Sequence, residues 1–85
     1  MTTEEIRTKV LAVLGEIAPE ADLSSIKADV PFRDQIDIDS MDYLNFVIAL
    51  DETFQANIPE EDYTQFVSLN ACVERLESSL GEVRA

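Results

Sequence analysis

DIDSMDYLNFVIALDETF, residues 37–54, combines a short acidic approach, one serine and a long run of apolar residues at helical spacing. Asp39 suits the capping position of a helix over residues 40–55, because its side chain can accept a bond from a first-turn N–H. Asp42 places a second carboxylate in that turn, at the positive end of the helix dipole. The pattern therefore predicts a strongly capped helix with Ser40 at its start.

Two apolar stripes run along this predicted helix. The core stripe consists of Phe46, Val47, Leu50 and Phe54, at the spacing of a buried face. The outer stripe consists of Met41, Leu44 and Ile48, offset around the helix axis. A helix that is apolar over more than half its circumference is either deeply buried or presents one stripe to a partner. The sequence leaves both alternatives open.

The rest of the chain predicts further helices around this one. We expect them over residues 2–17, 60–66 and 69–80, with a frayed tail over 82–85. Thr2 and Glu5 have capping-box spacing, and Ser68 suits the cap of the last helix. Pro59 suits the first helical position of the short helix, and Gly81 stops the last one. We predict one all-α domain over residues 1–85, a small four-helix bundle with three main helices, one short helix and a long first loop.

The long connection over residues 18–39 begins after Pro19, which ends the first helical pattern. Leu23 and Ile26 fit one short helical turn. Loops of this length in compact domains are usually functional or held to the core. Three spaced apolar residues predict that the loop is pinned to the core: Val30, Phe32 and Ile36.

Eighteen acidic and six basic residues give the chain a net charge of −12. This charge repels nucleic acids and anionic lipid, and favours partners with basic patches. Alternatively, it only keeps a small protein soluble. The single cysteine, the lack of a membrane-length apolar run and the lack of signal-peptide features predict a cytoplasmic monomer.

The composition disfavours catalysis. The chain has no histidine, so neither a Ser–His–Asp arrangement nor the usual proton shuttle is available. Cys72 lies on an apolar helical stripe and is predicted to be a packed core thiol. A calcium loop counted from Asp37 fails at three positions, because Met41, Asp42 and Ile48 stand where an oxygen ligand, Gly and Glu are required. We expect neither an enzyme nor a metal site.

Ser40 has two interpretations. Serine is a common helix cap, but Asp39 could serve equally well. A hydroxyl at a helix N-terminus is also a favourable place for a phosphate, since backbone N–H groups and the helix dipole favour an anion there. No base lies nearby in the sequence, so a separate enzyme would have to modify this hydroxyl.

At these residues the chain resembles the acyl carrier protein family. The family's signature is Asp-Ser-Leu at the start of the second helix of a four-helix bundle, and here Asp39-Ser40-Met41 is followed by Asp42. The similarity covers nearly the whole chain. It includes Phe32, the segment Leu50–Phe54, the junction Ile58–Glu61, and a last helix with Leu69, Val73 and Leu76.

The resemblance implies that Ser40, beside Asp39, carries 4′-phosphopantetheine, which a phosphopantetheinyl transferase attaches from coenzyme A. The arm would hold acyl groups as thioesters for acyl-transferring, condensing or modifying enzymes. The implied contacts with their basic patches are Asp39, Asp42, Asp51, Glu52 and Glu60, and the outer stripe would fill apolar pockets. Many relatives shelter an acyl chain near the positions of Val47, Leu50, Phe54, Ile58 and Tyr63.

Three departures from the family favour a dedicated carrier of polyketide or modified-lipid synthesis over the housekeeping carrier of fatty-acid synthesis. Ile36-Asp37 replaces Leu-Gly, Met41 replaces Leu, and Asn45 stands where an acid is common. Peptidyl carriers usually show Gly-Gly-x-Ser instead. The alternative function is an acidic helical adaptor that docks through the outer stripe without a prosthetic group.

Overall fold

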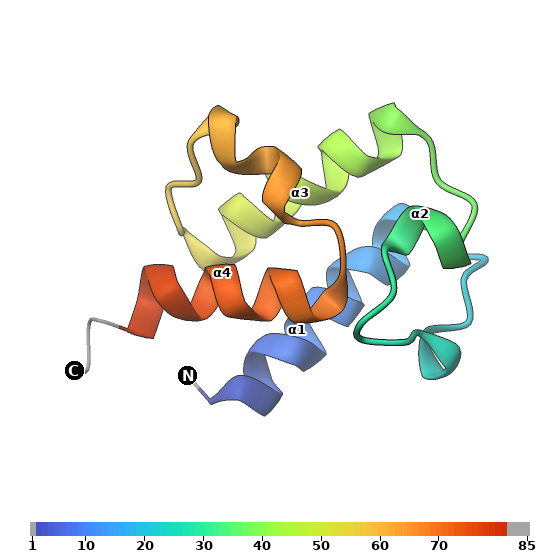
Figure 1. Ribbon diagram of the computed structural model, residues 1–85, viewed down its shortest axis with the longest axis horizontal. Helices are drawn as coiled ribbons and strands as arrows, with labels where there is room; N and C mark the ends of the chain where they lie inside the picture. Colours follow the sequence, from blue (N-terminus) through green and yellow to red (C-terminus); the bar gives the residue numbers. More distant parts are fainter. Residues whose placement is uncertain (1, 82–85) are drawn as a thin grey trace.

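Six helical elements follow one another along the chain. They are α1 (Thr3–Ile17), η1 (Leu23–Ser25), α2 (Phe32–Gln35), α3 (Ser40–Phe54), η2 (Glu60–Gln65) and α4 (Leu69–Gly81), where η marks a 3₁₀-helix. The computed structural model describes the backbone of residues 2–81 and the side chains of residues 2–79. The long helices α1, α3 and α4 enclose the core, and η2 lies beside α3 and α4 (Figure 1). The predicted all-α bundle is confirmed.

α1 begins with the predicted capping box. The Glu5 backbone N–H donates to the Thr2 hydroxyl at 3.1 Å, and the Thr2 backbone N–H donates to the Glu5 carboxylate at 2.7 Å. Thr2 is therefore the cap, and the helix starts one residue later than predicted. The Thr3 hydroxyl donates to the Glu77 carboxylate, which joins the start of α1 to α4. The capping box stabilises the start of α1, and the Thr3–Glu77 bond holds it against α4.

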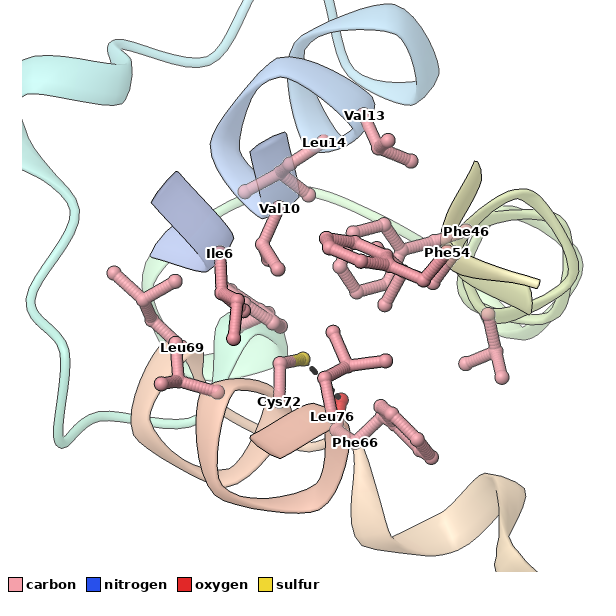
Figure 2. Packing of buried hydrophobic residues seen from close by; sticks show 14 of the residues in the cluster. Ile6, Val10, Val13, Leu14, Phe46, Phe54, Phe66, Leu69, Cys72 and Leu76 are labelled. Carbon is pink, nitrogen blue, oxygen red and sulfur yellow. Dashed lines mark hydrogen bonds between the residues drawn. The ribbon is translucent and has the colours of Figure 1, made fainter. Parts of the chain in front are cut away.

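The core lies between the three long helices (Figure 2). Side chains from α1, α3 and α4 point toward one another, and Phe66 closes the space from the end of η2. The rings of Phe32 and Phe46 meet edge to face, with centroids 5.3 Å apart. The fully buried side chains are Ile6, Val10, Leu14, Phe32, Phe46, Val47, Leu50, Phe66, Cys72 and Leu76. The predicted core stripe of α3 is therefore confirmed.

The connection from residue 18 to residue 39 is pinned to the core at two of the three predicted residues, because Val30 is partly buried but is not packed against the core. Phe32 is fully buried, and Ile36 is partly buried. The Gln35 side chain bonds to the backbone of this loop: its amide N–H groups donate to the Lys27 and Val30 carbonyls, both at 2.9 Å. Gly15 of α1 lets η1 approach closely, since a Cβ at Gly15 would lie 3.0 Å from the Leu23 side chain. Side chains therefore order this segment, although it has little regular structure.

One element was not predicted. The single turn α2 starts at the buried Phe32, whose backbone N–H donates to the Val67 carbonyl at 2.7 Å. The Asn70 backbone N–H likewise donates to the Ala28 carbonyl at 2.9 Å. Both bonds join the long loop to the start of α4. Such long-range bonds, rather than local periodicity, stabilise α2.

The boundaries of the last two helices differ slightly from the prediction. Pro59 lies just before η2 with an extended backbone, so it is not the first helical residue. Phe66 ends η2 and lies outside it. Ser68 caps α4 as predicted, because its hydroxyl accepts from the Ala71 backbone N–H at 3.2 Å. Gly81 is the last residue of α4 rather than the residue beyond it.

The predicted frayed tail over residues 82–85 lies outside the described residues. Within residues 2–81, we find no helix long and apolar enough to cross a membrane.

Candidate functional site

Ser40 is the first residue of α3 and is exposed. Asp39 caps the helix instead: the Asp42 backbone N–H donates to Asp39 Oδ1 at 2.8 Å. The Asp42 carboxylate in turn accepts from the Asp39 backbone N–H at 3.4 Å, which completes a capping box. Ser40 is therefore not the helix cap, which was one of its two interpretations. Its hydroxyl is available to solvent at the positive end of a four-turn helix.

The outer stripe begins beside Ser40 and runs along the solvent side of α3. Met41 is 64% exposed, Leu44 37% and Ile48 38%, whereas Phe46, Val47 and Leu50 of the core stripe are fully buried. Of the two alternatives for a helix with two apolar stripes, deep burial is thus wrong. α3 presents this row of apolar side chains to solvent.

The predicted recognition acids divide into two groups. Asp39, Glu52 and Glu60 are exposed. Asp42 and Asp51 are half-buried, and Asp51 accepts a hydrogen bond from the Ile58 backbone N–H at 3.2 Å. Asp51 therefore stabilises the turn after α3, besides any contact it makes with a partner.

A cleft of about 530 Å³ adjoins the first turn of α3. It lies between the segment after α1 and the end of α2, and Asp42 reaches its wall. Glu20, Asp22 and Asp37 also line it. Because four carboxylates surround this space, it is unsuited to a phosphate group or an apolar chain.

Comparisons with known proteins identify the family of this chain. The family described as "Phosphopantetheine attachment site" matches residues 4–76. The chain belongs to this acyl carrier protein family. An acyl carrier protein of Lactobacillus johnsonii is 33% identical over 92% of this chain and 96% of its own length. One from Prochlorococcus marinus is 30% identical over 95% of this chain and its own full length.

A third relative has a name that mentions a polyketide synthase. The polyketide-8 synthase acyl carrier protein 2 of Streptomyces avermitilis is 28% identical over 95% of this chain and 87% of its own length. The cofactor of the family is phosphopantetheine, as the sequence analysis expected. An exposed hydroxyl that is free of the capping role fits an ester bond to such a group.

The carrier chain's own thiol is unsuited to acyl transfer. Cys72 is fully buried in α4, and its Sγ lies 3.9 Å from the Phe66 carbonyl oxygen. Burial raises the pKa of the Cys72 thiol well above its ordinary value, so the nucleophilic thiolate is disfavoured. The predicted core role of Cys72 is confirmed.

Sequence reasoning missed one residue beside the site. Tyr43 lies one helical turn after Ser40, and its hydroxyl donates to the Tyr63 carbonyl of η2 at 2.5 Å. Burial raises the pKa of Tyr43 to about 12, so this hydroxyl stays protonated at neutral pH. The available signal was its helical spacing, because Tyr43 lies on the core stripe, four residues before Val47 and seven before Leu50. Its partner, 20 positions along the chain, could not be read from local spacing.

Proposed function

We propose that this chain holds acyl groups as thioesters on a 4′-phosphopantetheine arm attached to Ser40. It delivers them to enzymes of fatty-acid, polyketide or specialised lipid synthesis. The observation that carries this proposal is that the Ser40 hydroxyl is exposed and does not cap α3, because Asp39 and Asp42 form the capping box. The chain also belongs to the phosphopantetheine attachment family.

The attachment needs a second protein. The Ser40 oxygen would form a bond to the phosphorus of coenzyme A's pantetheine phosphate, and the nucleotide half of coenzyme A would leave. The serine proton needs an acceptor, and the chain has no histidine to take it. A phosphopantetheinyl transferase would supply the base and Mg²⁺. Asp39 already accepts a first-turn N–H, so the phosphate would project from the helix end into solvent.

α3 would be the surface that partner enzymes recognise. The outer stripe offers Met41, Leu44 and Ile48 to small apolar pockets. The proposed electrostatic contacts are Asp39, Asp42, Asp51, Glu52 and Glu60, which would meet basic patches on a transferase or on condensing and modifying enzymes. Complementary charge chiefly accelerates encounter, and the apolar contacts then slow dissociation.

We propose the pathway from the positions near Ser40 at which this chain differs from the usual family pattern. Asp37 stands where the family more often has Gly, and it lines the acidic cleft beside α3. Together with Met41 and Asn45, this favours a dedicated cytoplasmic carrier of polyketide or modified-lipid synthesis. The name of the Streptomyces avermitilis relative supports that direction.

The attachment can be tested with a matched pair of serine variants. Ser40→Ala should remain unmodified when it is incubated with coenzyme A, Mg²⁺ and a promiscuous transferase. Wild type and Ser78→Ala, which removes an exposed serine from α4, should each gain the mass of phosphopantetheine. Intact-mass spectrometry gives the result. An unmodified wild type with several transferases, or a modified Ser40→Ala, would refute the assignment.

The exposed outer stripe also supports a second candidate function, an acidic adaptor that docks without a prosthetic group. The two functions differ in their dependence on the hydroxyl. An adaptor's binding to its partner would survive Ser40→Ala, and protein recovered from its own cells would be unmodified.

A further inference from the structure

Gln35, the last residue of α2, uses both donors and the acceptor of its side-chain amide on the loop that precedes it. Its Nε2 donates to the Lys27 and Val30 carbonyls at 2.9 Å each, and its Oε1 accepts from the Lys27 backbone N–H at 2.8 Å. The turn itself contributes a longer bond, from the Val30 N–H to the Lys27 carbonyl at 3.4 Å. The Gln35 side chain therefore closes a loop over residues 27–35, the 27–35 loop.

The 27–35 loop is attached to the rest of the protein as well as to itself. The Ala28 carbonyl accepts a bond from the start of α4, and the Phe32 N–H donates to the chain just before α4. The Phe32 ring is fully buried and meets the Phe46 ring of α3 edge to face. The loop thus has a fixed place next to both α3 and α4.

The segment Ile36–Asp39 leads directly from Gln35 to Ser40 at the start of α3. Ile36 is partly buried against the core, and Ile38 is only 8% exposed. The segment is therefore anchored along its length and has little slack, so its path depends on where Gln35 is held. An enzyme that acts on the Ser40 hydroxyl meets this segment on the N-terminal side of the serine.

We propose that Gln35 is a positioning residue for the attachment of phosphopantetheine at Ser40. Its side chain holds the 27–35 loop closed, and the closed loop keeps the segment Ile36–Asp39 in the form that a transferase binds. This inference rests on the proposed carrier function. It concerns the protein before modification and assigns no contact between Gln35 and the reacting atoms.

The proposal predicts which kinetic constant changes when the Gln35 bonds are removed. In wild type the segment before Ser40 is held in one form before the enzyme binds. Without the bonds only a fraction of the molecules has this form, and the apparent affinity falls by that fraction. Once the enzyme has bound, the segment has the same form in both proteins. The loss should therefore appear in the KM for this chain and not in kcat.

The kinetic test uses Gln35→Ala and Gln35→Glu with coenzyme A, Mg²⁺ and one transferase, at a temperature where circular dichroism shows each variant to be folded. In Gln35→Ala the KM should rise about five- to tenfold, the effect of one lost hydrogen bond, because water replaces part of what is lost. Gln35→Glu keeps the size and the acceptor but loses both donors, so its KM should also rise. Its added negative charge favours encounter with a basic enzyme and cannot cause that rise.

Gln65→Ala is the matched control. Gln65 is an exposed glutamine of η2, and its amide donates to the Asp62 carboxylate at 3.3 Å, which keeps its bond from Arg75 in the variant. The KM of this variant should equal that of wild type. A wild-type KM in Gln35→Ala, whatever its kcat, or an equal rise in Gln65→Ala, would overturn the inference. If Gln35→Ala fails to fold, the KM of Gln35→Glu decides.

Hydrogen exchange tests the loop itself on unmodified protein. The Lys27 amide donates to the Gln35 side chain, so it should be protected in wild type and should exchange about five- to tenfold faster in Gln35→Ala. The Cys72 amide, which donates to the Ser68 carbonyl in α4, should keep its rate. An unprotected Lys27 amide in wild type, or equal acceleration at Cys72, would overturn the inference.

The failure of this inference can be distinguished from a failure of the carrier function. Wild type that gains no phosphopantetheine mass with several transferases refutes the carrier function, and the inference with it. Wild type that is modified, beside a Gln35→Ala variant with the same KM, refutes the role of Gln35 alone.

Discussion

Single residues decide the chemistry available at the start of α3. Asp39 and Asp42 exchange hydrogen bonds between side chain and backbone, so the helix start is stable without the Ser40 hydroxyl. Asp39 and Ser40 are neighbours, but one stabilises the helix and the other faces solvent. A group attached to Ser40, as we propose, would leave both of these hydrogen bonds in place.

The separation predicts different stabilities for two adjacent variants. Asp39→Ala removes the cap and should lower the free energy of unfolding by about 1 kcal/mol. Ser40→Ala should change it by less than about 0.5 kcal/mol, since exposed residues away from caps contribute little. Urea denaturation of both variants gives the two values. A Ser40→Ala loss as large as that of Asp39→Ala would show that Ser40 is a structural cap.

At the scale of elements, the long helices could be predicted because their signals are local. The caps at Thr2, Asp39 and Ser68 and the periodic stripes fixed α1, α3 and α4 to within a residue or two. The exposure of the outer stripe could not be decided from periodicity, which gives the angle between stripes but not what covers each one. The exposed fractions of Met41, Leu44 and Ile48 in the structure show that this stripe faces solvent.

The short elements depended on contacts that a sequence does not display. α2 exists because Phe32 is buried and bonds to the Val67 carbonyl. η2 is positioned by Tyr43 from α3 and by Arg75 from α4. These partners lie 13 to 35 positions apart, so spacing rules that work within one helix do not detect them. The position of Ser40 at the start of α3 was predictable, and the contact of Tyr43 with η2 was not.

The turn after α3 offers a stability test at the element scale. Gln55 ends α3 with φ 50°, in the left-handed region that favours glycine. Gln55→Gly should therefore raise the free energy of unfolding by about 0.5–1 kcal/mol.

Ala56→Gly is the matched control for that turn. Ala56 is not among the left-handed residues and packs partly against the core. Glycine there adds freedom to the unfolded chain and removes a packed methyl group, so it should destabilise the protein by at least a similar amount. Thermal melts of the two variants compare them directly. Destabilisation by Gln55→Gly would show that its side chain makes a contact that outweighs the backbone strain.

The whole molecule carries its charge in a small volume. The net charge of −12 is spread over a body that measures 37 × 25 × 19 Å. Over such distances, like charges interact when the Debye length is about 30 Å, at 0.01 M salt, and are screened when it is about 8 Å, at 0.15 M. Self-repulsion therefore opposes folding at low ionic strength.

Added salt should accordingly raise the melting temperature. Between about 0.01 M and 0.15 M salt, we expect an increase on the order of 5 °C, since 1 kcal/mol shifts the melting temperature of a domain of this size by about 4–8 °C. Sodium and tetramethylammonium chloride should act alike, because screening depends on charge alone. Calorimetry gives the values. No increase, or an effect of sodium only, would contradict screening as the cause.

The charge, the outer stripe and the exposed Ser40 together support our proposal that the protein is modified and then recognised by other proteins. Intact-mass spectrometry of the protein recovered from its own cells, with fragmentation to locate any added group, tests this account most directly. The account predicts an added phosphopantetheine on the fragment that contains Ser40. A protein that is entirely unmodified, or one modified at another residue, would contradict it.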